Sequence, residues 1–485
     1  MTSRPIILWF RNDLRLKDHA ALTAAVATGA PVIPVYVLDD VTPGRWTMGG
    51  ASRWWLHHSL AALSEDLEAR GSYLMLAGGD ALKVITDLAR QTGASHVYCS
   101  RAYEPFASAL ERGLKDELEQ QDCALKRYAG ALLAEPEAVL TKGGGPYKVY
   151  TPFWRALSAQ LKPHAPKPAP KAIASPRRLK GMRLEDFALL PAKPDWAGGL
   201  REAWTPGEAG ASERLTRFLG AAMAAYAEDR NRPDLPGTSR LSPHLHFGEI
   251  SPNACVWHAR TAAARRPGTD AGCETFLKEL AWRDFSHHLL AYVPSLPEKP
   301  FRPGWDVFPW KKDASLLAAW RRGRTGYPIV DAGMRELWQT GVMHNRVRMI
   351  VASFLVKDLL IPWQEGEAWF WDTLVDADLA NNSASWQWVA GCGADAAPYF
   401  RIFNPVSQGE KFDPDGAYVR RFVPELAQLP NAHLHAPFEA PKEVLAAARI
   451  TLGRDYPLPV VDHKRARVQA LAAYERVKAG TGASA

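Results

Sequence analysis

The stretch 363–401 holds the densest collection of residues that could do chemistry. It contains five tryptophans, the acid pair Asp376 and Asp378, and the adjacent amides Asn381 and Asn382. Indole rings supply large flat apolar surfaces, and buried carboxylates and amides must find hydrogen-bonding partners. The combination predicts a cavity that orders a flat ligand.

A second group, Gly237 to Pro243 (G-T-S-R-L-S-P), combines a glycine, three hydroxyl residues and an arginine just before an expected helix start. Backbone amides, hydroxyl donors and a positive charge are what a phosphate or pyrophosphate requires. Taken alone, the motif favours a capped turn.

Two expected helices carry polar and aromatic residues on one face, at spacings of three and four. On the first these are Glu279, Trp282, Arg283 and Ser286, and on the second Asn345 and Met349. Such groups suit a pair of planar heterocycles with imide edges. Ordinary hydrogen bonding between helices is the alternative.

No metal site is expected. Asp376-Ala377-Asp378 has the D-x-D form seen in sugar-nucleotide transferases, but no histidine or acid cluster accompanies it in the sequence. His244 and His246, two residues apart, do not fix a tetrahedral site by themselves. Trp386, Trp363 and Trp310 are either core residues or stepping stones for one-electron transfer.

The N-terminal part alternates short apolar runs with helical patterns. The runs 5–10, 31–38, 72–76 and 95–99 predict strands, and the segments between them predict helices. This pattern indicates a Rossmann-like parallel sheet covered on both faces. Because Arg11-Asn12-Asp13-Leu14-Arg15 follows the first strand in place of G-x-G-x-x-G, a ligand of this sheet must bind in another way.

The pattern of residue types changes after residue 130. Residues 162–183 are rich in proline, lysine and arginine, which predicts an extended connector with a solvated, or nucleic-acid-contacting, charge. Helical patterns dominate after residue 207, and Ser242-Pro243 and Ser251-Pro252 each predict a capped helix start. Further helices are expected at about 273–291, 329–340, 342–360, 441–448 and 463–478. We therefore expect an α/β domain over 1–130, a linker over 131–205 and an all-α domain over 206–485.

Composition fits a globular protein of at least two domains: 485 residues, 47% hydrophobic and 23% charged. The 18 tryptophans outnumber the 17 phenylalanines and 14 tyrosines, which favours a planar ligand or stacking on bases, with a Trp-rich core as the alternative. The net charge of +7 is compatible with a polyanionic partner if the charge is clustered.

Five scattered cysteines, with no Cys-x-x-Cys pair, argue against a disulfide framework and a thiolate zinc site. The N-terminal apolar run is too short for a signal peptide, and no stretch is long enough to span a membrane. We expect a cytoplasmic protein without membrane contact.

Several motifs together resemble the photolyase/cryptochrome family over nearly the whole chain. They are W-F-R-N-D-L-R-L-K-D (Trp9–Asp18), G-T-S-R-L-S-P, E-L-A-W-R-D-F (Glu279–Phe285), T-G-Y-P-I-V-D-A-G-M-R (Thr325–Arg335), M-H-N-R-V-R-M (Met343–Met349), D-A-D-L-A-N-N-S-A-S-W-Q-W (Asp376–Trp388) and P-Y-F-R-I-F-N-P (Pro398–Pro405). The resemblance implies an N-terminal α/β antenna domain and an all-α C-terminal FAD-binding domain. The fully reduced, anionic flavin is then the catalyst.

By position, the resemblance implies a set of FAD contacts: Tyr226, Thr238, Ser239, Arg240, Leu241, Ser242, Phe276, Glu279, Arg283, Arg348, Asp376, Ala377, Asp378 and Asn382. Tyr226 and residues 238–242 would hold the pyrophosphate, the two aspartates the polar edge of the flavin, and Asn382 would face flavin N5. Arg348 is expected to pair with Asp376, since a buried charge needs a partner.

Most similar are the enzymes that repair cyclobutane pyrimidine dimers. The implied dimer-binding residues are Trp282, Arg283, Asn345, Arg346, Met349, Trp388 and Arg401, with Glu279, Asn345, Met349 and Asn382 in the catalytic roles. Trp282 and Trp388 would stack on a flipped-out lesion. An electron from excited reduced flavin would split the dimer and return.

The choice within the family is repair or signalling. Asn382 is the amide of repair enzymes, whereas plant cryptochromes have an aspartate there. His344-Asn345 differs from the His-His pair of (6-4) repair enzymes, and no long tail is expected after Lys478. The expected protein is a monomeric lyase acting on UV-damaged DNA. A photoreceptor without repair is the alternative, and a metal-dependent nucleotide-sugar transferase a third hypothesis.

Two accessory features also follow from the resemblance. Trp386, Trp363 and Trp310 would relay electrons to oxidised FAD, with Trp320 as a further branch. The stretch Gly49–Leu60 is similar to plant cryptochromes and to the photolyases nearest to them, which are class III-like. Methenyltetrahydrofolate in a different pose is the expected antenna, with 8-hydroxy-5-deazaflavin or an empty site as alternatives.

Overall fold

The computed structural model describes residues 3–396 and 400–481. The described chain divides into two compact units, each discontinuous in sequence. The first comprises residues 1–224, 239–294 and 375–378, and the second residues 225–238, 295–374 and 379–485. The predicted linker 131–205 thus lies inside the first unit, and the boundaries at 130 and 205 stay predictions.

The first unit contains a five-stranded parallel sheet in the order β3-β2-β1-β4-β5. Its strands are β1 (Ile6–Phe10), β2 (Val32–Leu38), β3 (Met75–Gly78), β4 (His96–Ser100) and β5 (Ala124–Tyr128). β1 and β2 are apolar and almost wholly buried, as in a sheet covered on both faces. The Rossmann-like α/β prediction is therefore confirmed, although β3 starts three residues later than expected and β5 was missed.

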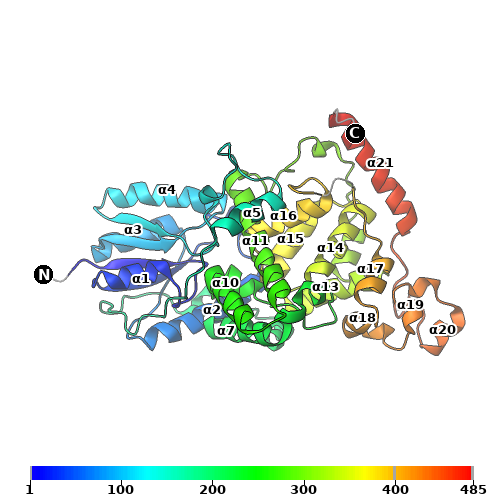
Figure 1. Ribbon diagram of the computed structural model, residues 1–485, viewed down its shortest axis with the longest axis horizontal. Coiled ribbons are helices and arrows are strands. Elements are labelled where there is room, and N and C mark those ends of the chain that lie inside the picture. Colours follow the sequence, from blue (N-terminus) through cyan, green and yellow to red (C-terminus); the bar gives the residue numbers. More distant parts are fainter. Residues whose placement is uncertain (1–2, 397–399, 482–485) are drawn as a thin grey trace. The chain divides into compact units, whose positions relative to one another are not determined.

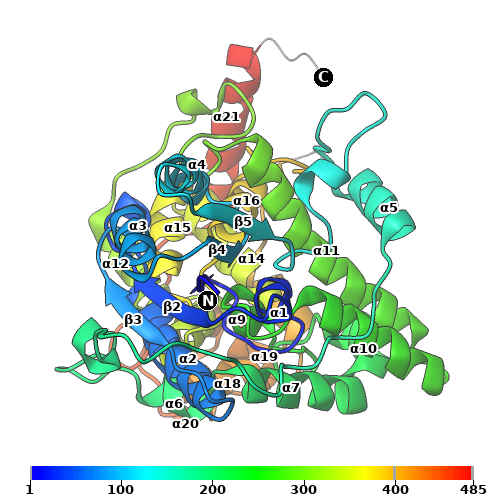
Figure 2. The ribbon, with the colours of Figure 1, turned by 90° about the vertical axis from the view of Figure 1, so that its left-hand side faces the viewer.

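Ten α-helices accompany this sheet in the described part of the first unit. They are α1 (Ala20–Ala27), α2 (Gly50–Glu68), α3 (Ala81–Thr92), α4 (Pro105–Glu119), α5 (Tyr150–Gln160), α6 (Gly198–Ala203), α7 (Glu208–Arg217), α9 (Ser242–His246), α10 (Pro252–Arg265) and α11 (Asp270–Tyr292). Helices α1 and α2 lie on one side of the sheet and α3 and α4 on the other (Figure 2), as right-handed crossovers require.

The proline-rich connector is extended, as predicted. Residues 161–183, all of them described, form no helix or strand. However, α5 lies inside the predicted linker and packs against α11. The predicted linker 131–205 therefore contains a packed helix as well as an extended connector.

The two predicted Ser-Pro helix starts behave differently. The Ser251 hydroxyl accepts a hydrogen bond from Ala254 N and caps α10, as predicted. Ser242 is the first residue of α9 and not its cap, which is Leu241, and its hydroxyl donates to the Asp376 carboxylate.

The second unit is built of helices (Figure 1). They are α8 (Tyr226–Asp229), α12 (Ala314–Arg321), α13 (Pro328–Thr340), α14 (Asn345–Ser353), α15 (Trp363–Thr373), α16 (Leu379–Ala390), α17 (Pro405–Phe412), α18 (Ala417–Phe422), α19 (Asn431–Leu434), α20 (Lys442–Ala447) and α21 (His463–Thr481). The predicted helix 342–360 begins at Asn345 and ends in a π-helical turn, Phe354–Asp358. None of the helices in the described ranges is long and apolar enough to cross a bilayer.

Candidate active site

The segment that follows β1 holds the candidate phosphate-binding segment against the sheet. Gly248 has φ +65°, and a Cβ there would lie 2.1 Å from the carbonyl oxygen of Asn12. Leu14 N donates to Phe247 O at 3.0 Å, and Arg15 Nη1 donates to Gly248 O at 2.8 Å. The two backbones therefore touch, which fixes α9 next to the carboxyl end of β1.

The same motif anchors α10. The Asp18 carboxylate accepts hydrogen bonds from the Ser251 hydroxyl and, at 3.1 Å, from Asn253 Nδ2. Asp13 lies 3.0 Å from His19 Nε2. Burial by itself would raise the pKa of Asp13, but His19 and hydrogen-bond donors hold it well below its usual range. The Trp9–Asp18 motif thus serves the scaffold.

The turn that precedes α9 is tightly packed and contains one residue with a left-handed backbone. A Cβ on Gly237 would lie 2.9 Å from Asp229 O, so only glycine fits there. Arg240 has a left-handed backbone, φ +51°, and its guanidinium lies 4.5 Å from the centre of the Trp204 ring. Because that side chain lies on an indole, we expect Arg240 to contribute to an anion through its backbone amide.

The acid pair in the first unit takes two different sets of partners. Asp376 accepts a hydrogen bond from Ser242, whereas the Asp378 Oδ2 atom lies 3.3 Å from His287 Nε2 and 3.6 Å from His246 Nδ1. Burial would raise the pKa of Asp378, but the imidazoles outweigh it and hold the pKa well below its usual range.

His287 completes a buried ion pair with that carboxylate. Burial alone would lower the pKa of His287, yet the Asp378 carboxylate outweighs it and raises the pKa. His287 Nδ1 also donates to Arg283 O at 3.0 Å. Asp378 is therefore held as a carboxylate beside an imidazole whose pKa it raises, and it is able to accept a hydrogen bond from an imide N–H.

Helix α11 presents the predicted polar and aromatic face. Glu279 and Trp282 are both partly exposed. Arg283 instead donates from Nη1 to Ala131 O at 2.6 Å and from Nη2 to Leu245 O at 3.4 Å, so it also ties α11 to two neighbouring segments. Asp284 accepts hydrogen bonds from Leu133 N and Ala134 N, and burial raises its pKa to about 6.

Asn382 in the second unit has a fixed orientation. Its Nδ2 donates to Glu367 O at 3.0 Å, and the side chain is 7% exposed. Holding the amide nitrogen in this way leaves Oδ1 as the group that can accept a further hydrogen bond.

Trp386 is buried in a tight seat. A Cβ on Gly366 would lie 2.1 Å from Cη2 of the indole. The ring centre lies 6.2 Å from that of Trp320 and 5.0 Å from that of Phe370. The structure thus places Trp320, the further branch of the predicted relay, beside Trp386. Trp363 is buried and Trp310 packs on Phe308, and the relay through them stays a prediction.

The start of α14 gathers the second group of predicted lesion residues. His344 Nδ1 accepts from Arg346 N and caps the helix, Asn345 is its exposed first residue, and Met349 follows one turn later. Arg346 donates to Asn231 Oδ1 at 2.6 Å. Burial, aided by the nearby guanidinium groups, lowers the pKa of His344 to about 4, so this imidazole is neutral.

A small, partly open pocket in the second unit brings Trp388 and Arg401 together with residues that the sequence did not single out. It is lined by Arg302, Lys357, Trp388, Val389, Gly391, Phe400, Arg401, Phe403 and Tyr474. Burial lowers the pKa of Lys357 to about 7, and its Nζ donates to Arg401 O. No sequence pattern marks Lys357, which lies in an apolar helix.

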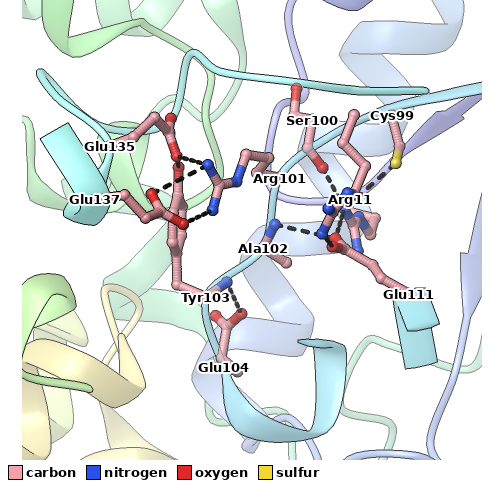
Figure 3. Close-up of polar contacts among 11 residues, drawn as sticks. Arg11, Cys99, Ser100, Arg101, Ala102, Tyr103, Glu104, Glu111, Glu135 and Glu137 are labelled. Carbon is pink, nitrogen blue, oxygen red and sulfur yellow. Dashed lines mark hydrogen bonds and ion pairs between the residues drawn. The ribbon is translucent and has the colours of Figure 1, made fainter. Parts of the chain in front are cut away.

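The place where a doubly wound sheet usually binds its ligand is filled by protein. That place is the crevice between β1 and β4, where the strand order reverses. There the Arg11 guanidinium donates to Ser100 O and, at 2.6 Å, to the buried Glu111 carboxylate (Figure 3).

Beside it, Arg101 binds Glu135 and Glu137, and the Tyr103 hydroxyl donates to Glu135 at 2.9 Å (Figure 3). The Tyr103 ring also meets His287 edge-on, with centroids 5.7 Å apart. The loop after β4 therefore supports the imidazole that pairs with Asp378.

The remaining predicted contacts stay predictions. Phe276 and Tyr226 are buried, and Arg348 Nε donates to Met343 O at 2.7 Å. The same holds for Thr238, Ser239, Leu241 and Ala377 and for the expected pairing of Arg348 with Asp376. Pro398 and Tyr399 of the last motif lie outside the described residues.

Comparison with known proteins identifies the family. A family model for the FAD binding domain of DNA photolyase matches residues 276–476, and one for DNA photolyase matches residues 6–171. The chain is 54% identical to the deoxyribodipyrimidine photo-lyase of Agrobacterium fabrum, over 99% of this chain and 100% of that one.

Two further relatives are similar over most of this chain. Cryptochrome-1 of Arabidopsis thaliana is 40% identical over 95% of this chain and 69% of its own length. The crystal structure of a bacterial class III photolyase from Agrobacterium tumefaciens superimposes with a TM-score of 0.95 at 53% identity, over 99% of this chain and 98% of that one. The chain belongs to the photolyase/cryptochrome family and carries its FAD-binding domain.

Proposed function

We propose that this protein is a light-dependent lyase that splits cyclobutane pyrimidine dimers in UV-damaged DNA. The observation that carries the proposal is the 54% identity with a deoxyribodipyrimidine photo-lyase over essentially the full length of both chains. Membership of this family leaves the nucleotide-sugar transferase hypothesis without support.

The proposed FAD contacts include residues of each unit. In the first unit, the 239–242 backbone suits the pyrophosphate, and Asp376 and Asp378 suit the polar edge of the flavin. Asp378, ionised and balanced by His287, can accept a hydrogen bond from the imide. In the second unit, Asn382 offers a fixed amide oxygen. Tyr226, Thr238, Phe276, Glu279, Arg283, Arg348 and Ala377 complete the proposed set.

When bound in its reduced, anionic form, FAD supplies the photoexcited electron. The protein's own contribution is pre-organisation: it holds the dimer, excludes water and places donors where negative charge develops. Glu279 and Asn345 would hydrogen-bond the dimer, with Met349 beside them. None of these roles requires a general acid or a general base. The neutral imidazole of His344, next to Asn345, is consistent with this.

Lesion binding would use aromatic surface and positive charge. Trp282 in the first unit and Trp388 in the second each offer an indole to a flipped-out dimer. Arg283, Arg346 and Arg401 would add charge for the phosphates. Extrusion costs a few kcal/mol, and less for a damaged, poorly stacked pair, so part of the selectivity comes from the DNA.

For the antenna we propose methenyltetrahydrofolate, with 8-hydroxy-5-deazaflavin as the alternative. The Arg11–Glu111 pair at the β1–β4 crevice supports a pose away from that crevice. We further propose that the protein acts as a cytoplasmic monomer.

The second candidate function is a blue-light photoreceptor without repair activity. The 40% identity with cryptochrome-1 of Arabidopsis thaliana is the observation behind it, and it is lower than the 54% identity with the photo-lyase. One experiment separates the two. Chemically reduced protein is incubated with a thymine-dimer oligonucleotide, illuminated or dark, and dimer loss is measured. We expect repair only in the light, whereas no repair by protein that retains reduced FAD would refute the lyase.

A further inference from the structure

Tyr150, in a segment expected to be a linker, stacks directly on Trp282. The two ring centroids lie 3.7 Å apart with an interplanar angle of 6°. This is a full face-to-face contact, in which the phenol covers one of the two faces of the indole. Trp282 itself remains partly exposed.

The phenol is tied at its other end as well. The Tyr150 hydroxyl donates to Lys278 O at 2.6 Å. Lys278 O is also the carbonyl to which Trp282 N donates within α11, by the regular i to i−4 pattern. Ring and hydroxyl together fix the phenol plane, which in turn fixes the plane of the indole.

A small aromatic cluster backs this pair. Phe285 lies 5.9 Å from the Tyr150 ring and meets Trp282 edge-on at 5.8 Å, and Phe153 packs on Phe285 at 5.2 Å. Tyr150 and Phe285 are buried. The stack therefore rests on the packed contact between α5 and α11.

We infer that Tyr150 is a positioning residue of the lesion site: it covers one face of Trp282 and holds the indole so that a flipped-out dimer packs on the surface that stays exposed. The inference rests on the proposed function. A pre-positioned indole loses little freedom on binding, so the stack should raise affinity for the dimer. It should leave binding of undamaged DNA unchanged, because no base is flipped there.

The test is a double-mutant cycle on full-length protein carrying FAD. Dissociation constants are measured in the dark for one oligonucleotide with and without a thymine dimer, for wild type, Tyr150→Leu, Trp282→Ala and the double variant. We expect Tyr150→Leu to weaken dimer binding by about 2- to 10-fold, the range for an aromatic pair. In the Trp282→Ala background the same change should have no further effect.

Tyr147→Leu is the matched control. Tyr147 packs edge-on against Phe153 in the same cluster, with centroids 6.3 Å apart, and this variant should bind the dimer like wild type. If Tyr150→Leu does not retain FAD, Tyr150→Met replaces it, with the same expected loss.

Each outcome is decisive. Equal dimer binding by wild type and Tyr150→Leu, or additive losses in the double variant, would overturn the positioning role while leaving the lyase intact. Wild-type protein that binds both oligonucleotides equally and repairs neither would refute the proposed function, and the inference with it.

Discussion

Replacing Gly366 with alanine should disturb Trp386 specifically. The added Cβ would lie 2.1 Å from Cη2, 2.5 Å from Cζ3 and 2.6 Å from Cζ2 of the indole. Since carbon atoms pack at about 3.5–4.0 Å, the nearest ring atom would have to move by roughly 1.5–2 Å. Trp386 is only 2% exposed and lies between Trp320 and Phe370, so there is little room.

Two effects on stability oppose each other. Alanine is favoured over glycine in a helix interior by ~1 kcal/mol, whereas overpacking of a filled core costs ~1–3 kcal/mol. We therefore expect Gly366→Ala to lower the free energy of unfolding by about 0–2 kcal/mol. Gly220 also lies in helical backbone, and a Cβ added there would meet no atom within 4 Å. Gly220→Ala should be neutral or stabilising.

The assay has two parts. Denaturant unfolding gives the stability, and illumination of protein with oxidised FAD in the presence of an external reductant gives the rate of photoreduction. Gly366→Ala should slow photoreduction while protein reduced beforehand still repairs dimers. Wild-type photoreduction and stability in Gly366→Ala would refute the argument that this glycine seats Trp386.

Three further predictions follow from the site. Trp386→Phe should block photoreduction of FAD but spare repair by chemically reduced protein, and unchanged photoreduction would dismiss the relay. Glu279→Ala should lower the quantum yield of repair without releasing FAD, as followed by dimer loss per absorbed photon and by flavin absorbance; normal repair would remove its assigned role. Burial lowers the pKa of His344 from 6.5 to about 4 in the folded protein. As pH decreases through 6.5 towards 4, the unfolded chain therefore binds a proton that the folded protein does not bind, and the free energy of unfolding should fall. His344→Asn keeps a capping side chain but removes the titrating group, so its free energy of unfolding, measured at several pH values, should fall less steeply. The same pH dependence in wild type and His344→Asn would contradict this assignment.

The strongly buried strands of the fold could be predicted from local sequence patterns. Apolar runs identified β1, β2 and β4, because these strands lie inside the sheet. Strand β5 was missed: it is an edge strand of sequence A-L-K-R-Y whose residues are exposed or only partly buried, so it has no apolar run. Register and order could not follow from the sequence, since they depend on pairing between distant segments.

Caps show the same limit at the level of one residue. Ser251 and Ser242 both precede proline, yet only Ser251 caps a helix. Each hydroxyl also donates to a carboxylate far away in sequence, Ser251 to Asp18 and Ser242 to Asp376, so this donated bond does not decide which serine is the cap. The difference is that α9 begins one residue earlier than the Ser-Pro pattern predicts, at Ser242 itself.

Some residues of the candidate site could likewise be predicted from local spacing, and others could not. Face-sharing residues such as Glu279 and Trp282 follow from helical spacing alone. Tyr150 and Lys357 do not, because their importance depends on contacts made over long sequence distances: Tyr150 donates to a carbonyl 128 residues later. The buried partner of Asp378, His287, lies on the predicted helix but was not singled out, and its spacing in W-R-D-F-S-H-H gave no metal or catalytic pattern.

The contacts of the Trp9–Asp18 motif also set the order of events during synthesis. Arg15 and Asp18 each bond to a residue 233 positions later, Gly248 and Ser251. At roughly 5–20 residues per second, a ribosome needs about 10–50 s to supply those partners. Until then the nascent N-terminal sheet carries an arginine and an aspartate without these partners, so the contacts of the first unit are completed only after residue 251 has been made.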